Sequence, residues 1–273
     1  MNPLREQQDR FPSLTVSEVD EGAILKIAIT SPRSALNTVD EQLHHELEEL
    51  FAVLRATPPG ALRAIILTGN GVAFSAGGDF AWFQQLQGTE RLLELQRSAK
   101  AMIWNLLDVE VPIVVALEGP AVGLGASLAL LCDAVVACPS TRISDPHVRV
   151  GLVAGDGGAV IWPLTAGPAV AKRHLLTGDP LTGGEAFRLG LVTDLVEEDK
   201  VQNKALAIAR TIARQPPIAV RYTKAAINKG VRHQMELVFD YATALEITTF
   251  QTADHVEAVS ALIESRHPTF EGR

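Results

Sequence analysis

The sequence predicts an α/β protein in which helices pack against sheets, and three observations support this class. Short runs of β-branched apolar residues alternate with segments of helical periodicity through the first 200 residues. Two of these runs end in glycine-rich loops that lead into helix-compatible segments, the order expected of strand–loop–helix units. No strand pattern remains after about Lys200, so we expect residues 1–200 to form the core with the active site and residues 201–273 a C-terminal helical region.

An opening hairpin is expected at the start of the core. Residues 14–19 and 23–30 are rich in β-branched side chains, and the turn formers of residues 20–22 separate them. A helix is expected over residues 39–55, where apolar residues recur at helical spacing, and the Pro-Pro-Gly sequence of residues 58–60 stops it.

The strand–loop–helix unit then occurs twice, and helices alone follow. In the core, we expect a strand over 63–68, a helix over 89–107, a strand over 113–117, a helix over 125–131 and a strand over 133–138. In the C-terminal region, we expect helices over 201–214, 217–228, 235–252 and 254–264. No low-complexity segment or long linker interrupts the chain, so no independent domains are expected.

Composition excludes several classes of protein. With 47% hydrophobic and 21% charged residues, a chain of 273 residues can bury a sizeable core, so disorder is not expected. The formal net charge of −8 carries no concentrated basic stretch, which argues against a nucleic-acid partner or an anionic membrane surface. Residues 1–13 are polar, and no segment has the roughly 18 apolar residues of a membrane span. We therefore expect a soluble cytoplasmic protein.

The cysteines and the paired histidines indicate neither a disulfide framework nor a metal site. Cys132 and Cys138 are too few for a framework and lack a metal-ligand or redox spacing, so we interpret both as buried structural thiols. His44 and His45 are adjacent, and adjacent side chains of a helix do not face the same way. The sequence therefore predicts no metal, and it predicts a surface helix at this pair.

The two glycine-rich loops, residues 74–80 and 118–127, are the most informative motifs. Glycine allows a backbone to approach a ligand closely where a Cβ atom would clash. Two such loops can aim backbone N–H groups at one carbonyl oxygen, and preorganised donors of this kind stabilise the negative charge that develops there during reaction. Either loop alone is also compatible with an ordinary strand-to-helix turn.

With its flanking motifs, the chain resembles the crotonase family, also called the enoyl-CoA hydratase/isomerase family. The resemblance implies the crotonase spiral of repeated ββα units with a C-terminal helical oligomerisation region, assembled as a homotrimer or a dimer of trimers. It rests on the two glycine loops and on residues 31–37, 131–133, 176–179, 186–192 and 268–273. A shared fold does not fix the reaction.

The resemblance implies positions for an oxyanion hole. The two backbone N–H groups fall on Gly78 and on Leu124, where the family usually has glycine. Asp79 is suited to cap the following helix, and we prefer that structural role to a catalytic one.

The resemblance also implies a binding site for coenzyme A as part of the substrate, with no permanently bound cofactor. Backbone around Ala35, Ala76 and Gly77 matches the segments that hold the pantetheine and adenine. Arg33 is a candidate for the phosphates, and it is equally compatible with a solvated surface position.

The acid–base positions depart from the family. Its two glutamates align with Ser127 and His147, and a serine hydroxyl without an activating partner is not a useful base at neutral pH. Imidazole titrates near neutrality, and Asp156 can orient it as in a catalytic dyad. A purely structural alternative places His147 in the first turn of a helix capped by Ser144 or Asp145, with Asp156 in a turn.

Glu246, on a late helix, is a possible additional pocket carboxylate, but we prefer a position on a solvated face or at an interface. The leading hypothesis is an acyl-CoA enzyme of fatty acid metabolism, a lyase or isomerase that hydrates or isomerises a 2-enoyl-CoA through an enolate, with His147 and Asp156 replacing the glutamates. One alternative is retro-Claisen hydrolysis of a β-diketone, because the His147–Asp156 pair resembles the one in the branch of the family that catalyses this reaction. That branch also has a histidine at the position of Leu124, which this chain lacks. The other is a non-catalytic acyl-CoA-binding paralogue.

Overall fold

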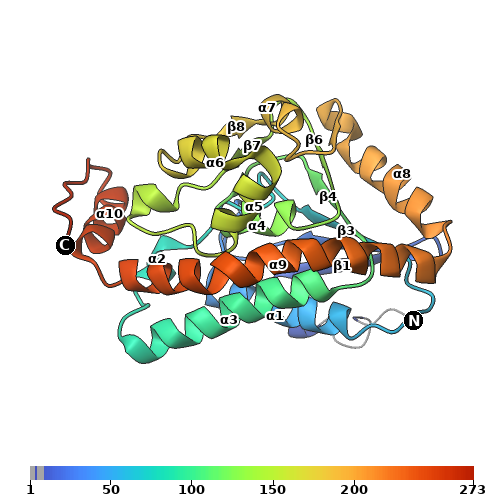
Figure 1. Cartoon of the computed structure of the whole chain (residues 1–273), viewed down its shortest axis with the longest axis horizontal. Helices are drawn as coiled ribbons and strands as arrows, with labels where there is room; N and C mark the ends of the chain where they lie inside the picture. The colour runs from blue at the N-terminus through green and yellow to red at the C-terminus, as the bar shows by residue number, and fades with distance from the viewer. Residues whose placement is uncertain (1–3, 5–8) are drawn as a thin grey trace.

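The computed structural model describes Leu4 and residues 9–273, and it contains two sheets with helices packed around them (Figure 1). The larger sheet has the order β1 (Leu14–Val19), β2 (Ile24–Ile29), β3 (Ala64–Gly69), β4 (Ile113–Leu117), β6 (Ala134–Ala137) and β9 (Asp194–Leu195). The smaller has the order β5 (Ala121–Val122), β7 (Arg142–Ser144) and β8 (Leu181–Thr182).

Helices form the remaining layers. In the core they are α1 (Glu41–Arg55), α2 (Phe80–Phe83), α3 (Thr89–Asp108), α4 (Leu124–Leu130), α5 (Gly158–Ala166), α6 (Pro168–Leu175) and α7 (Gly183–Arg188), with the short 3-10 helices η2 (His147–Val150) and η3 (Glu198–Lys200). The C-terminal helices are α8 (Val201–Ala213), α9 (Pro217–Thr249) and α10 (Ala253–Ile263). This arrangement confirms the α/β class and the C-terminal helical region that the sequence predicts.

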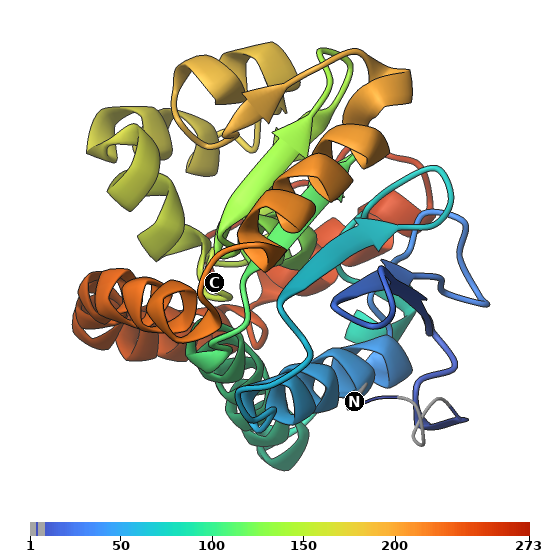
Figure 2. The same ribbon diagram turned by 90° about the vertical axis from the view of Figure 1, so that its right-hand side faces the viewer.

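The strands β2, β3, β4 and β6 of the larger sheet are buried on both faces, which explains their nearly continuous apolar sequences. Ile65 and Leu67 of β3 face a core shared with α1 and α3. Their neighbour Ile66 faces the opposite way and packs with Val201 and other residues of α8 (Figure 2). Successive side chains of a strand point to opposite faces, so one short apolar run serves both layers.

The N-terminal hairpin is confirmed, because β1 and β2 pair antiparallel with Leu14 opposite Ile29. β3, β4, β6 and β9 then add in parallel. The helix expected to begin at Val39 begins at Glu41, since the Asp40 carboxylate caps it by accepting from the Leu43 N–H. The role of Asp79 as a cap is also confirmed, because its side chain accepts from the Trp82 N–H at the start of α2.

Two expectations for helices were wrong in detail. The helices expected over 217–228 and 235–252 are one helix, α9, which runs through Gly230 without a break and crosses the front of the molecule beside α3 in Figure 1. A single glycine costs a helix only about 1 kcal/mol, which tertiary packing on α3 and α5 offsets. The strands β5, β7, β8 and β9 and the helices α5, α6 and α7 were not predicted, because they have two to nine residues and little periodicity.

The two glycine loops lie side by side and are joined by backbone hydrogen bonds. The Phe74 N–H donates to Pro120 O at 3.0 Å, and the Val122 N–H donates to Ser75 O at 2.9 Å. A Cβ at Gly125 would lie 2.7 Å from the Ser75 Cβ, so the close approach requires glycine there. Within the described part of the chain, no helix is long and apolar enough to cross a membrane.

Candidate active site

A cavity of about 60 Å³ lies where the glycine loops meet α9. Its polar wall brings together residues far apart in the sequence: His44, Gly78, Leu124, His147, Asp156 and Glu246. The structure thus gathers at one point the two N–H positions and the three titratable groups that the sequence nominates. Glu246 comes from α9, whereas the other five residues precede residue 200.

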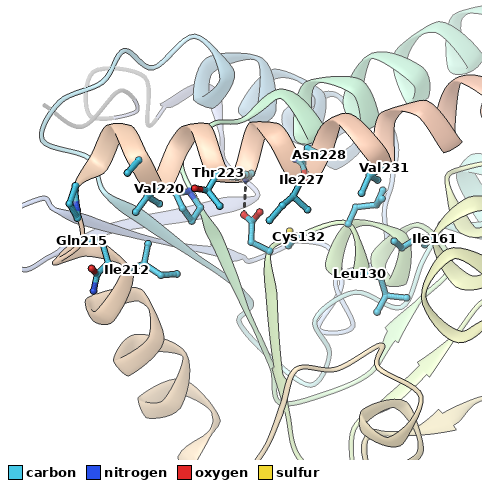
Figure 3. A pocket seen from close by; sticks show the side chains of 16 residues that line it. Leu130, Cys132, Ile161, Ile212, Gln215, Val220, Thr223, Ile227, Asn228 and Val231 are labelled. Atoms are coloured by element: carbon cyan, nitrogen blue, oxygen red, sulfur yellow. Dashed lines mark hydrogen bonds and ion pairs between the residues drawn. The ribbon is translucent and has the colours of Figure 1, made fainter.

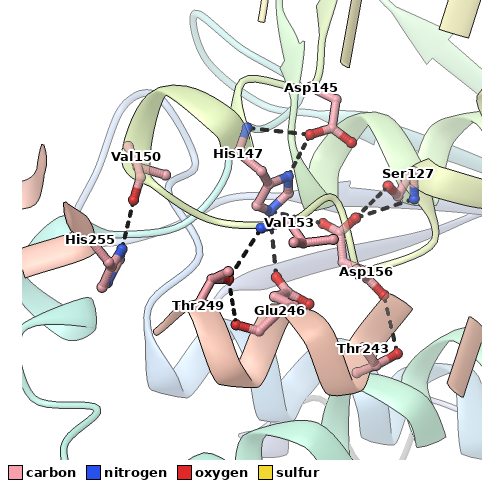
Figure 4. Close-up of polar contacts among 12 residues, drawn as sticks. Ser127, Asp145, His147, Val150, Val153, Asp156, Thr243, Glu246, Thr249 and His255 are labelled. Carbon is pink, nitrogen blue, oxygen red and sulfur yellow. Dashed lines mark hydrogen bonds and ion pairs between the residues drawn. The ribbon is translucent and has the colours of Figure 1, made fainter. Parts of the chain in front are cut away.

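His147 is held by a carboxylate that the sequence analysis did not pair with it (Figure 4). Its imidazole Nδ1 contacts Asp145 Oδ1 in a short hydrogen bond, and its backbone N–H lies 3.4 Å from the same oxygen. Asp145 follows β7 directly and is 1% exposed. Because a buried carboxylate only accepts, Nδ1 carries the proton and Nε2 is left for the cavity.

Asp156, expected as the partner of His147 or as a second base, does lie beside the imidazole, but the ring forms its direct hydrogen bond with Asp145. Asp156 lies at the other nitrogen, with Oδ2 3.6 Å from Nε2. Its Oδ1 accepts from Ser127 Oγ at 2.8 Å and lies 3.4 Å from the Gly158 nitrogen. Ser127 is fully buried and donates to this carboxylate, which agrees with the expectation that it is not a base.

Glu246 completes the ring of carboxylates around the imidazole. Its Oε1 lies 3.8 Å from His147 Nε2, and the residue is 8% exposed, so it is neither solvated nor at a surface. A Cβ added to Gly155 would lie 2.4 Å from Glu246 Oε2, which shows how closely the loop carrying Asp156 packs on α9. Only glycine permits that approach.

Burial and mutual charge set the protonation of this cluster. Burial disfavours the imidazolium, but the charges of Asp145, Asp156 and Glu246 outweigh it and raise the pKa of His147 well above 6.5. Burial raises the pKa of Asp156, against the opposing effects of His147 and Ser127. Burial also raises the pKa of Glu246 to about 8. Protonated His147 and protonated Glu246 are therefore both favoured at neutral pH, and loss of one proton from this cluster gives the form in which Nε2 can act as a base.

The Gly78 and Leu124 N–H groups are both available to a ligand. Neither donates a hydrogen bond to another group of the described chain, and both residues line the cavity. Leu124 is the first residue of α4, and the N–H groups of a first helical turn have no partner within the helix. Gly78 must be glycine, since a Cβ there would lie 2.1 Å from the Phe83 ring.

A second cavity, of about 190 Å³, adjoins the first through Gly78 and His147. Ala76 and Gly77 line it, as expected for a binding channel. Ala35 lies close by in the chain fold, because the next residue, Leu36, accepts a hydrogen bond from the Ala76 N–H at 2.9 Å. Arg33 is exposed and forms an ion pair with Asp40 at 3.1 Å, away from the residues that line this cavity.

His44 is a site residue that the sequence analysis placed wrongly. It was expected on a surface helix, but it is 3% exposed and lines the cavity, whereas its neighbour His45 faces solvent. The helical spacing of Leu43, Leu47 and Leu50 did contain a signal, because His44 precedes Leu47 by three positions and shares its buried face.

The two cysteines differ in burial. Cys138 is buried as expected, whereas Cys132 is only partly buried.

One group of residues in the described ranges could be considered for a metal ion, namely Asp145, His147 and Asp156. Asp145 contacts Nδ1 of the imidazole, whereas Asp156 lies nearest to Nε2. An ion bound at one nitrogen would leave the carboxylate at the other unused. The arrangement suits an acid–base centre better than a cation site, and the absence of a metal stays a prediction.

A larger cavity, of about 560 Å³, lies along the opposite part of α9 (Figure 3). Its wall is mostly apolar, and its one ion pair, Lys224 with Asp133 at 2.7 Å, is already satisfied. Burial raises the pKa of the Cys132 thiol there, so it is not a nucleophile at neutral pH. Size alone therefore does not identify the reactive site.

The chain is similar to known proteins in both sequence and fold. The enoyl-CoA hydratase/isomerase family matches residues 20–273. The crotonyl-CoA hydratase of Syntrophomonas wolfei is 30% identical over 251 residues, 92% of this chain and 95% of that protein. An enoyl-CoA hydratase/isomerase structure from Mycobacterium paratuberculosis matches with a TM-score of 0.85 and 35% identity, over 91% of this chain and 97% of its own. A β-diketone hydrolase from the cyanobacterium Anabaena sp., bound to (S)-3-oxocyclohexyl acetic acid, matches with a TM-score of 0.82 and 30% identity, over 89% and 97%.

The family match covers residues 20–273, and the paired glycine loops meet at one cavity within that range. The chain belongs to the enoyl-CoA hydratase/isomerase family, the crotonases.

Proposed function

We propose that the protein hydrates or isomerises a 2-enoyl-CoA thioester, using His147 where the family has a glutamate. The observation that carries this proposal is the position of His147 Nε2, which faces the cavity beside the free N–H groups of Gly78 and Leu124. The adjoining cavity lined by Ala76 and Gly77 gives the pantetheine arm a route to the same point. The named relative that hydrates crotonyl-CoA supports the thioester class.

In hydration, the thioester carbonyl accepts from the Gly78 and Leu124 N–H groups, which stabilise its developing charge. In the form in which His147 is neutral and Glu246 is protonated, His147 Nε2 removes a proton from water, and the water oxygen bonds to the β-carbon as the carbon–carbon double bond becomes an enolate. Protonated Glu246 then gives its proton to the α-carbon. Transfer of the proton from Nε2 to Glu246, whose oxygen lies 3.8 Å away, restores the starting state.

Cleavage of a β-diketone is a second candidate, and a specific observation favours it. Asp145 holds the imidazole in the arrangement that activates water in hydrolases, and a solved β-diketone hydrolase matches this fold at 30% identity. In this reaction, activated water bonds to one carbonyl carbon, the adjacent carbon–carbon bond breaks, and the enolate that leaves is protonated. Leu124 in place of a histidine argues against it.

A substrate panel separates the candidates. Purified protein is given 2-enoyl-CoA thioesters and cyclic and linear β-diketones, and products are identified by mass spectrometry. We expect a hydrated or isomerised thioester. Cleavage of a diketone without coenzyme A would transfer the assignment to the second candidate. Tight binding of thioesters with no turnover of either class would instead indicate a non-catalytic binding protein.

The pH dependence of turnover tests the role of Glu246. The reactive form shares one proton between His147 and Glu246, so the apparent pKa values belong to the pair. Because the pKa of Glu246 is about 8, raising the pH through this value removes that proton, and kcat/KM should fall about tenfold per unit above it. Glu246→Gln cannot titrate at this position and should lack this alkaline limb. A variant with an unchanged limb would exclude Glu246 as its source.

A further inference from the structure

His44, Ser98 and Glu48 form a hydrogen-bonded chain between α1 and α3. Ser98 Oγ lies 2.6 Å from Glu48 Oε2 and 3.1 Å from His44 Nδ1. Ser98 is 7% exposed, and the Glu48 side chain reaches solvent at the edge of the two helices. The chain therefore connects the surface with the reactive cavity that His44 lines.

The proton positions in this chain follow from the donors available. A carboxylate only accepts, so the single Ser98 hydroxyl hydrogen points to Glu48. The Ser98 oxygen must then accept from His44, which places a proton on Nδ1. Burial lowers the pKa of His44 to about 3, so the ring is neutral and Nε2 has no proton. His44 Nε2 is a fixed hydrogen-bond acceptor.

A hydrogen-bond donor, the Trp82 indole N–H, belongs to a ring beside His44, and neither it nor His44 Nε2 has a hydrogen-bond partner in the described residues. No group in the described residues bonds to His44 Nε2, and the Trp82 indole N–H is buried without an acceptor. The two rings lie 5.4 Å apart between centroids and line the same cavity. His44 and Trp82 also border a cavity of about 20 Å³ whose wall includes charged side chains. Apart from Gln96, Thr243 and the reactive groups, the other side chains that line the reactive cavity are apolar, Phe83 and Leu95 among them. Unpaired polar groups in such a wall are costly unless a ligand pairs them.

We propose that this part of the cavity binds a hydroxyl group of the substrate, which donates to His44 Nε2 and accepts from Trp82 Nε1. A hydroxyl is the small group that both donates and accepts, whereas an alkyl group would leave both ring nitrogens unpaired. The inference rests on the proposed function and narrows its substrate class to thioesters with a hydroxylated acyl group, an alcohol or a phenol.

Binding of unreactive ligands tests the proposal apart from catalysis. Saturated acyl-CoA thioesters cannot be hydrated, so their affinity is measured by calorimetry for a plain acyl chain and for chains with a hydroxyl on successive carbons. One hydroxylated ligand should bind about tenfold more tightly than the plain chain, and His44→Leu should lose this difference. His233→Leu, which changes an exposed histidine on α9, is the control and should keep it. Equal affinities across the panel, or a preference that survives in His44→Leu, would refute the proposal.

A spectroscopic measurement on the unmutated protein removes dependence on folding of the variant. In ¹⁵N spectra, His44 should show a protonated Nδ1 and an unprotonated Nε2 at neutral pH, and addition of a small alcohol or phenol should shift Nε2. A protonated Nε2, or no shift with any probe, would overturn the inference. This probe needs no coenzyme A, so a shift in a protein that turns over no thioester would sink only the proposed function. Turnover of plain chains without a shift would sink only the hydroxyl site.

Discussion

Replacement of His147 by glutamine is expected to lower kcat by about 10²–10⁴-fold, the contribution of a positioned acid–base group. Glutamine can still donate to Asp145, so this buried carboxylate does not lose its partner, but the amide cannot take a proton from water. Affinity for the substrate should change little, because the N–H groups of Gly78 and Leu124 and the adjoining cavity are untouched.

The measurement is steady-state kinetics on whichever substrate the panel identifies, together with binding of a saturated analogue. His233→Gln is the matched control, since this histidine lies exposed on α9 and should leave both quantities at the unmutated values. If kcat of the His147 variant fell less than about threefold, the acid–base role would have to move to Asp156 or Glu246.

Asp145→Asn should cost about 10³–10⁴-fold in kcat with little change in shape. Asparagine can turn its N–H toward Nδ1, which moves the imidazole proton to Nε2 and removes the base from the cavity. The site leaves no room for compensating movement, because a Cβ at Gly158 would already lie 2.0 Å from Asp145 Oδ2. The carboxylate thus acts as a positioning residue through His147.

Two measurements distinguish a change in the His147 tautomer from misfolding of the Asp145→Asn variant. The pKa of His147 is raised well above 6.5, so the ¹⁵N spectrum is recorded at a pH above it, where His147 should be protonated at Nδ1 in the unmutated protein and at Nε2 in the variant. Thermal unfolding should establish that the variant is folded. Asp240→Asn changes an exposed carboxylate that pairs with Lys100, and it should leave kcat and the His147 spectrum as they were. A folded Asp145 variant with normal kcat would show that tautomer selection does not limit the reaction.

Local patterns were sufficient for most of the core. The strands and long helices have clear periodicity, and the glycine loops follow from residue types that tolerate close backbone approach. A break in α9 was wrongly expected in the stretch that contains Gly230. The tertiary packing that stabilises the helix there cannot be read from the local sequence. The boundary proposed at residue 200 and the trimeric or hexameric assembly stay predictions.

The cavity was harder to foresee than the fold. His147, Asp156 and Glu246 were nominated from the resemblance, but the distances that relate them depend on a loop, a 3-10 helix and α9 meeting in space. Asp145 entered the sequence analysis only in the structural alternative, as one of two possible helix caps, because its neighbourhood has that local pattern. His44 was missed because its burial depends on α3, which begins 45 residues later.

The hydrogen bonds that join the two glycine loops also determine how the site behaves in motion. The Phe74–Pro120 and Val122–Ser75 bonds make the two loops one unit, so a thermal displacement of one loop displaces the other with it. The separation between the Gly78 and Leu124 N–H groups is then preserved while the pair shifts relative to α9. Fluctuations would therefore alter the distance from the bound thioester carbonyl to Glu246 more than the distance between the Gly78 and Leu124 N–H groups.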